Sequence, residues 1–447
     1  MSGLILSIFL ILALAIAVAQ PYVGVLLYVW MSVFYPHRWV YGGLELSWSM
    51  IAAIIAGLGF LNRREPPVFN RSTITVLLLL FFFWTTITSI LAIFQDVAWQ
   101  RWADFGKVLI TFFIVSALTV NRFRLNALIW AIIAGAGAVA TKGFLQTALT
   151  GGASQVVGIP GSSFIDNNDI ARLFGLCFPF MLFMAFHGGT KWLRWASLSL
   201  AFAAIVAIIG TQSRGAFAAL AVTMLYWFFI SRRKLAMAAT ALSIASLIGL
   251  LLVGPFRDAW VERMETIEDY ETDGSFQGRV FAWNFAISIA ERSPITGDGF
   301  GAFRGAITDQ GRWKDAHSIY FETLGEHGVV GLVLLLSLFG FGFLRARKIT
   351  KVAGKDPKLY FERDLSIATQ FSLIFFLIAG LVGSETYHEL SYLILALIAV
   401  LDHNLIKRPQ LLARWLGDAA MASRGEEEAL ADGRALGGMP AARAARR

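Results

Sequence analysis

An arginine stands between two apolar stretches of the chain, in the tetrapeptide Gln-Ser-Arg-Gly at 212–215. A guanidinium binds an anionic group through its charge and through two parallel hydrogen bonds, which makes Arg214 a candidate anion ligand with Ser213 as its supporting hydroxyl. The alternative is structural, because an arginine at the end of an apolar segment often extends its head group toward water. The residue types alone leave both interpretations open.

A second arginine, Arg279, begins a stretch at 279–291 in which apolar and polar residues are mixed. This pattern predicts an amphipathic helix that lies near a membrane surface. A helix N-terminus offers free backbone N–H groups and the positive end of the helix dipole, so an arginine at this point would favour a phosphate group. A solvated loop arginine is the alternative.

A histidine lies in the run Ala-His-Ser-Ile-Tyr-Phe-Glu at 316–322, which leads through Gly-Glu-His-Gly at 325–328 into the next apolar stretch. Near neutral pH a histidine can accept a proton from a hydroxyl group, so His317 is a candidate general base, and Glu322 could support it. The alternative is a polar surface histidine, since a single histidine in a loop commonly has no catalytic role.

Other motifs favour structural roles. The run Asp-Asn-Asn-Asp at 166–169 predicts the N-terminal cap of a helix that starts near residue 170. The glycine-rich run at 297–301 predicts a turn, because no βαβ unit surrounds it. The acidic run at 269–274 lacks the glutamate that a calcium loop requires at its end, where this chain has Val280.

Three further cations near helix ends could join a phosphate site: Arg172, Lys107 and Lys142. We expect no metal site and no cofactor. The only cysteine, Cys177, lies inside an apolar run, which leaves no disulfide framework and no cysteine-based metal site.

The composition shows which elements must hold these residues. Hydrophobic residues make up 57% of the 447 and charged residues 15%, with a mean hydropathy of +0.64, whereas a soluble domain carries roughly 25% charged residues. An apolar run that crosses a hydrocarbon core of about 30 Å must be a helix, since backbone polar groups cannot stay unpaired in lipid. We expect such helices near residues 4–19, 22–35, 47–61, 74–94, 105–120, 125–142, 170–186, 195–209, 215–231, 236–254, 328–344, 364–382 and 386–403.

The net charge of +8 does not indicate a nucleic-acid partner, because the basic residues gather in short clusters between the apolar runs, where they set helix orientation. One side holds Arg63, Arg64, Arg71, Arg122, Arg124, Lys191, Arg194, Arg232, Arg233, Lys234, Arg345, Arg347, Lys348, Lys351, Lys355, Lys358 and Arg363. The short connections on the opposite side hold only Arg38, Arg101, Lys107 and Arg214. The richer side is cytoplasmic by the positive-inside rule, so the three motifs face outward.

We therefore expect an all-α polytopic integral membrane protein of about 12 transmembrane helices with one large, partly helical periplasmic loop. Its parts are an N-terminal transmembrane bundle at 1–254, a periplasmic loop with the active site at 255–327, C-terminal transmembrane helices at 328–408 and a cytoplasmic, disordered tail at 409–447. Twelve crossings, with the first segment broken at Pro21, place the N-terminus inside. Thirteen crossings place the N-terminus outside. A processed N-terminus is the third alternative, because Ala-Val-Ala at 17–19 resembles a signal-peptidase site.

The order of the motifs resembles that of the O-antigen ligase and polymerase superfamily of bacterial inner-membrane glycosyltransferases. Ser-Arg-Gly at 213–215 comes first, Arg279 follows in a long outer loop, and His317 with Glu322 precedes the next span. The resemblance covers roughly residues 165–345.

Within this superfamily the chain is most similar to the branch of exosortase-associated O-glycosylation ligases. Members of this branch show a similar His-Ser-Ile-Tyr-Phe-Glu run and an acidic stretch like that at 265–273. Many ligases have an asparagine after the histidine, where this chain has Ser318.

The resemblance implies a donor glycan on undecaprenyl pyrophosphate at the periplasmic side of the inner membrane, and an acceptor hydroxyl, most often on a lipid A–core sugar. It implies that Arg214 and Arg279 bind the pyrophosphate and that His317 deprotonates or orients the acceptor. Because the leaving group is an anion, positive charge can stabilise it without a metal. Attack from the opposite face would invert the anomeric carbon.

Three alternatives remain open. A polysaccharide polymerase or a protein O-oligosaccharyltransferase of the same superfamily would share the donor and the transfer step. A secondary transporter would belong to another class. Transporters commonly place ionisable residues near the bilayer midplane and show repeated halves, whereas here the polar candidates gather at helix ends.

Overall fold

The computed structural model describes residues 2–41, 46–61, 72–230, 274–307, 315–384, 386–407 and 409–417. The α-helices are α1 (Ser2–Ala19), α2 (Pro21–Phe34), α3 (Trp48–Leu61), α4 (Thr73–Ile90), α5 (Gln95–Leu118), α6 (Arg122–Leu149), α7 (Asn167–His187), α8 (Lys191–Thr211), α9 (Arg214–Ile230), α12 (Gly274–Arg292), α13 (Ile319–Ala353), α14 (Tyr360–Ala379), α15 (Glu389–Asp402) and α16 (Leu412–Leu416). Short turns used below are η2 (Ala302–Gly305) and η4 (Gly380–Val382).

The predicted all-α class is confirmed, since the described part of the chain contains helices and no β-strand. Among these residues seven helices are long and apolar enough to cross a membrane: Thr73–Ile90, Arg122–Leu149, Asn167–His187, Lys191–Thr211, Ile319–Ala353, Pro357–Val382 and Glu389–Lys407. Shorter apolar helices are Gly3–Ala19, Pro21–Phe34, Trp48–Leu61 and Arg214–Ile230. The predicted span at 236–254 lies outside the described residues, so the count of about 12 crossings stays a prediction.

Prolines and polar caps fix where helices begin. Pro21 is the first residue of α2, a position where its missing N–H costs no hydrogen bond, and the backbone is not helical at Gln20. The predicted break at Pro21 is thus present. Asp166 caps α7 and forms a reciprocal capping box with Asp169, which confirms the cap expected at 166–169.

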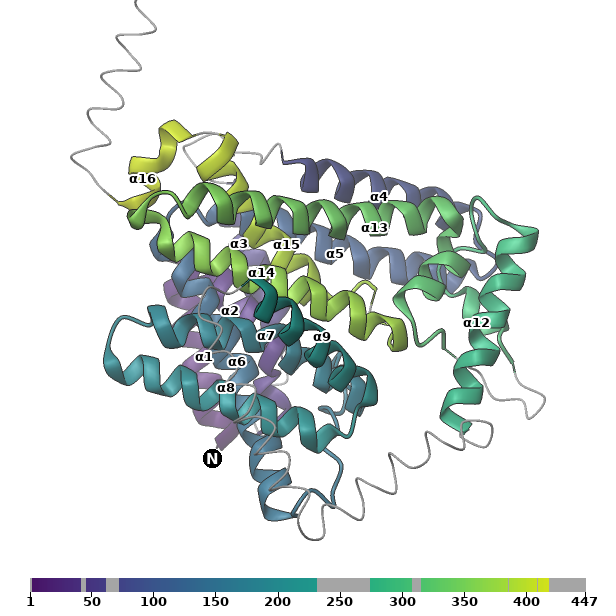
Figure 1. Ribbon diagram of the computed structural model, residues 1–447, viewed down its shortest axis with the longest axis horizontal. Helices are drawn as coiled ribbons and strands as arrows, with labels where there is room; N and C mark the ends of the chain where they lie inside the picture. The colour runs from purple at the N-terminus through teal and green to yellow at the C-terminus, as the bar shows by residue number, and fades with distance from the viewer. Residues whose placement is uncertain are drawn as a thin grey trace, which may run out of the picture.

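Helices α4, α5, α13 and α14 lie alongside one another and run roughly horizontally in Figure 1. Helix α13 packs on α4 and α14, and α15 packs on α5; helices α6, α7 and α8 pack together, and α14 contacts α7 and α9. Helix α12 lies at the right end of the view, close to the N-terminus of α13, and α16 lies at the left end. We refer to the end that holds α12, the start of α13 and η4 as the motif end.

Helix α7 is buried along most of its length. A helix that is apolar on all sides belongs in an interior. Gly175 lets α14 approach closely, because a Cβ atom there would lie 2.0 Å from Cζ of Phe375. Small residues commonly allow such contacts between membrane helices.

Helix α12 confirms the amphipathic helix predicted at 279–291. Its apolar side, with Ala282, Ala286 and Ile289, is buried against Phe303 of η2 and Ala316. That α12 lies near a membrane surface stays a prediction. The long loop predicted at 255–327 is described only from 274 onward, with a gap at 308–314.

Helix α13 begins earlier than the apolar stretch predicted at 328–344. It consists of two helical segments divided at Gly328, whose φ of 65° and ψ of −169° are not helical. The first segment, 319–327, is separated from His317 only by Ser318, the N-cap residue. The second runs from 329 to Ala353 and holds the apolar residues that the sequence pattern detects.

Candidate active site

The turn η4 at the end of α14 brings two of the three predicted motifs together. On one side Gly215 packs against it, because a Cβ atom on Gly215 would lie 2.2 Å from Cγ2 of Val382. On the other side Ile319 packs against Gly380, where a Cβ atom would lie 2.5 Å from Cδ1 of Ile319. The start of α9, with Arg214, and the start of α13, next to His317, therefore flank one short turn.

The connection from α8 to α9 orients Arg214. Gln212 has a left-handed backbone with φ of 54°, which turns the chain sharply after α8. The Ser213 hydroxyl then accepts a hydrogen bond from the Ala216 N–H at 3.3 Å and donates one to Oδ1 of Asn168 at 2.8 Å. Ser213 thus fixes the start of α9 against α7, and Arg214 is the half-buried first residue of α9.

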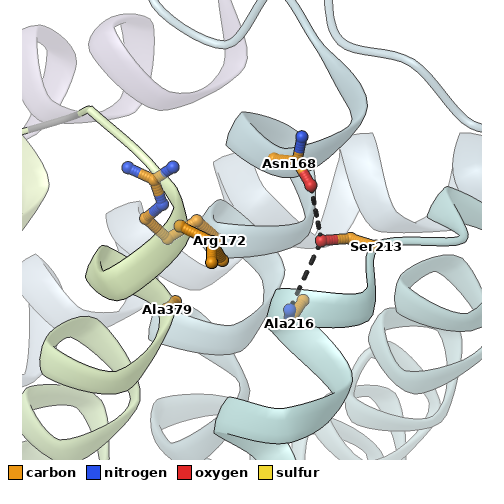
Figure 2. Close-up of a pocket in the computed structure, with 6 residues that line it drawn as sticks. Asn168, Arg172, Ser213, Ala216 and Ala379 are labelled. Atoms are coloured by element: carbon orange, nitrogen blue, oxygen red, sulfur yellow. Dashed lines mark hydrogen bonds between the residues drawn. The ribbon is translucent and has the colours of Figure 1, made fainter. Parts of the chain in front are cut away.

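A small pocket lies beside this turn, between α7, α9 and η4. It is lined by Asn168, Arg172, Ser213, Ala216, Ala379 and Val382. Figure 2 shows the Ser213 hydroxyl between Asn168 and the backbone N–H of Ala216, and the guanidinium of Arg172 pointing away from Ser213. The pocket is therefore polar on its Ser213 side.

Arg172 is almost completely buried, with 2% of its side chain exposed, and its Nη2 lies 3.6 Å from Oδ1 of Asp169. Its guanidinium lies against Gly383, where a Cβ atom would be 1.9 Å from Nη2. Arg172, predicted to support a phosphate site, thus lies at the motif end and packs against the segment that connects α14 to α15.

The place of Arg279 differs from the prediction. Helix α12 begins at Gly274, so Arg279 lies more than one turn inside it and not at its N-terminus. The free backbone N–H groups belong to the first turn of a helix, and the argument that they assist Arg279 is wrong. The predicted start at 279 is late because Gly274 and Gly278 give the first residues of α12 a weak helix signal in the sequence.

Helix α12 is nevertheless tied to the histidine motif. Trp283, one turn after Arg279, donates a hydrogen bond from Nε1 to the carbonyl oxygen of Ala316 at 3.1 Å. Its ring stacks on Phe321 with 5.1 Å between centroids. Because residues four apart share a helix face, Arg279 lies on the side of α12 that faces the segment around His317.

His317 is half-buried and has a left-handed backbone, with φ of 47°. Few non-glycine residues adopt this conformation, and those that do often lie at functional sites. Ser318, the N-cap residue of α13, is buried, and its hydroxyl has no hydrogen-bond partner among the described residues. The histidine thus stands where the chain turns into α13.

The remaining predicted residues lie apart from these contacts. Nζ of Lys107 pairs with Asp104 at 2.7 Å on the exposed side of α5. Nζ of Lys142 lies 4.5 Å from the ring centroid of Trp39. Within the part of the chain that the structure describes, no contact joins either lysine to the three motifs.

Glu322 is part of a buried ionic cluster that sequence reasoning missed. Arg101 of α5 bridges Glu322 and Glu326 of α13, and Tyr387 donates a hydrogen bond to Glu326 at 3.3 Å. Burial and the negative charges of Glu326 and Glu322 raise the pKa of Tyr387 well above its usual range, so its phenol keeps its proton. The four-residue spacing of Glu322 and Glu326 was the available signal, since it places both carboxylates on one helix face.

The site thus belongs to a multi-pass membrane protein that gathers arginine, histidine and glutamate at one end of its helices. Residues 199–336, which include all three motifs, match the family model described as O-Antigen ligase. This match confirms the predicted resemblance to the O-antigen ligase superfamily, and it indicates a ligase- or polymerase-type function of the glycosyltransferase kind. Residues 1–189 match a model described as Family of unknown function (DUF5935). No curated protein matches the chain.

Proposed function

We propose that this protein transfers a glycan from undecaprenyl pyrophosphate to an acceptor hydroxyl, with a lipid A–core sugar as acceptor, at the periplasmic face of the bacterial inner membrane. The observation that carries the proposal is the placement of the Arg214 and His317 motifs on the two sides of η4. Helix α12, which carries Arg279, is joined to the residue before His317 through Trp283. The family match over these segments supports the same chemistry.

In the proposed reaction Arg214 and Arg279 bind the pyrophosphate of the donor. Two guanidinium groups can pair with its oxygens and stabilise the negative charge that grows as the bond between the sugar and the pyrophosphate breaks. The products of this bond cleavage are the transferred glycan and undecaprenyl pyrophosphate. We propose that transfer needs no metal ion, because the arginines supply the positive charge.

His317 accepts the proton of the acceptor hydroxyl as its oxygen attacks the anomeric carbon. Attack from the side opposite the pyrophosphate inverts this carbon. The left-handed backbone at His317 and the packing of Ile319 on Gly380 hold the imidazole at the start of α13. Ser213 has a positioning role, because its hydroxyl fixes the start of α9 and thus Arg214.

The test is transfer of a defined glycan from undecaprenyl pyrophosphate to purified lipid A–core by the detergent-solubilised protein, with and without EDTA. We expect product in both conditions. His317→Ala should lower the rate at least about a hundredfold while donor binding persists, since general base catalysis contributes roughly that factor. Arg214→Ala and Arg279→Ala should weaken donor binding. Arg194→Ala, at an exposed arginine of α8 toward the opposite end of the bundle, is the matched control.

Other outcomes separate the alternatives. A ladder of product lengths would identify a polymerase, and product on a protein but not on lipid A–core would identify a protein O-oligosaccharyltransferase. Full activity of His317→Ala would remove the proposed base. Absence of donor binding by the wild-type protein would contradict the whole proposal and return the secondary transporter to consideration.

A further inference from the structure

A buried ionic cluster joins α5 to the first segment of α13. Nη2 of Arg101 donates to Oε1 of Glu322 at 2.7 Å, and Nη1 donates to Oε1 of Glu326. The second oxygen of each carboxylate is also occupied, by the hydroxyl of Thr386 at 2.6 Å on Glu322 and by that of Tyr387 at 3.3 Å on Glu326. The side chains of Glu322 and Glu326 are 1% and 0% exposed, and that of Arg101 is 34% exposed.

The backbone of the first segment of α13 is also held in place, by hydrogen bonds. The break at Gly328 leaves carbonyl groups just before it without the N–H partners that a continuous helix would supply. The turn after α12 supplies them, since the N–H of Asp298 donates to the Gly325 carbonyl at 3.0 Å and that of Gly299 to the Glu326 carbonyl at 2.9 Å. Segment 319–327 is therefore a separate unit, docked on one side by this turn.

Glu326 takes part both in the ionic cluster with Arg101 and in the contacts with the turn after α12. Its Oε1 accepts the N–H of Gly301 at 2.9 Å as well as the bond from Arg101. The ring of Phe300 lies 5.7 Å from the guanidinium carbon of Arg101 and covers it on one side. Arg101 is thus the point at which α5, the turn after α12 and segment 319–327 are joined.

Two buried carboxylates four residues apart repel each other unless a cation lies between them. The planar fork of an arginine can meet both with separate N–H groups, whereas a lysine offers one compact charge. Breaking such a buried pair by removing one partner leaves uncompensated charge and is strongly destabilising. The orientation of segment 319–327 therefore depends on Arg101.

We propose that Arg101 is a positioning residue for glycan transfer: by bridging Glu322 and Glu326 it sets the orientation of segment 319–327 and so the place of His317 in front of it. This inference rests on the proposed function, in which His317 receives the acceptor proton. Arg101 acts through the segment and binds neither donor nor acceptor.

The role has a kinetic signature. Loss of the bridge moves His317 but leaves Arg214 and Arg279, so the KM for donor should stay within about twofold while kcat falls. A displacement of a catalytic group by about 1 Å can cost on the order of a hundredfold in rate. We therefore expect Arg101→Gln to lower kcat roughly ten- to a hundredfold and Arg101→Lys to retain an intermediate rate.

The test combines kinetics with hydrogen–deuterium exchange on the full-length protein in detergent. Arg101→Gln should speed amide exchange of peptides within 315–327 roughly tenfold or more, with no change in the second segment of α13. The matched control is Arg304→Gln, which removes an arginine of η2 that pairs with Asp96 of α5 at 3.2 Å; this pair is exposed on both sides. Arg304→Gln should leave kcat and the rate of amide exchange unchanged.

Because Arg101→Gln leaves two buried charges unpaired, a second variant removes them. The triple substitution Arg101→Met, Glu322→Gln, Glu326→Gln has no buried charge in the cluster, and such replacements of buried ion clusters often preserve folding. It cannot form the bridge, so it should show the same loss of kcat and the same faster exchange.

Normal kcat and normal exchange in the folded triple variant would overturn the inference, as would a raised donor KM with unchanged kcat in Arg101→Gln. If the wild-type protein shows no glycan transfer, the proposed function fails. The exchange measurement then still decides whether Arg101 fixes the orientation of segment 319–327. The two failures are thereby distinguishable.

Discussion

The protonation state of His388 affects the stability of the motif end. It is the N-cap residue of α15, and its Nδ1 accepts a hydrogen bond from the Leu390 N–H at 3.2 Å, which requires an unprotonated nitrogen. Its ring also packs against Phe164, with 4.5 Å between centroids. Burial and, to a lesser extent, the positive charge of Arg172 lower the pKa of His388 to about 4, while Asp169 opposes this shift.

This lowered pKa predicts a loss of stability in acid. The unfolded histidine binds its proton near pH 6.5 and the folded one near pH 4, so the unfolded chain holds more protons between these values. The free energy of unfolding should therefore fall as the pH falls from 6.5 to 4, by on the order of 1 to 3 kcal/mol from this group. His388→Asn keeps a capping side chain without a titrating ring.

The measurement compares thermal unfolding of the detergent-solubilised wild-type and His388→Asn proteins at pH 7 and pH 4.5. We expect the wild-type protein to lose more stability between the two values than the variant does. Equal losses would show that His388 makes no contribution to the acid sensitivity.

At the scale of the element, α13 depends on one residue with unusual backbone angles. The φ of 65° and ψ of −169° at Gly328 fall in a region that only glycine enters readily. A Cβ atom at this position would also lie 2.2 Å from the carbonyl oxygen of Ile295, a backbone atom that cannot rotate away. The break in α13 and the close contact with the turn after α12 therefore both require a glycine at position 328.

Gly328→Ala should therefore lower the free energy of unfolding by about 1 to 3 kcal/mol and reduce transfer by disturbing the segment behind His317. Gly340→Ala is the matched control in the same helix, because a Cβ atom at Gly340 meets nothing within 4 Å. An alanine in a regular helix is favoured over glycine by roughly 0.5 to 1 kcal/mol, so this control should be neutral or slightly stabilising. Thermal unfolding and transfer assays measure both effects, and equal stability of the two variants would contradict the explanation.

At the scale of the whole molecule, the orientation of the bundle decides whether the motif end can meet a lipid-linked glycan. The charge pattern between the apolar runs predicts that this end is periplasmic. The opposite end holds the connection between α7 and α8, with Lys191 exposed. Since the sole cysteine, Cys177, is buried, its replacement gives a background for placing single cysteines.

We expect a membrane-impermeant maleimide to label Ser288→Cys, at an exposed position of α12, in spheroplasts that keep the inner membrane intact. It should label Lys191→Cys only after the membrane is permeabilised. Both variants are made in a Cys177→Ala background, which alone should give no signal. The reverse labelling pattern would place the motif end in the cytoplasm and exclude a periplasmic transfer reaction.

Sequence information alone was sufficient to predict the all-α class, most helix positions, the cap at Asp166 and the helical character of 279–291. These properties depend on local information: the length of apolar runs, the chemistry of a few capping residues and the spacing of apolar positions along one helix. The ordered motifs around Arg214, Arg279 and His317 were also visible, because each is a short run of neighbouring residues. The predicted resemblance to the O-antigen ligase superfamily is confirmed by the match over 199–336.

The contacts between these motifs are seen only in the folded chain. Arg101 lies 221 residues from Glu322 and 225 residues from Glu326 in the sequence, and nothing local to any of them specifies the pairing. In the sequence Arg101 contributed only to the charge count between spans. The break at Gly328 likewise depends on packing against the turn after α12. Contacts between distant segments form only when the helices are packed together, and they set the geometry on which the proposed transfer depends.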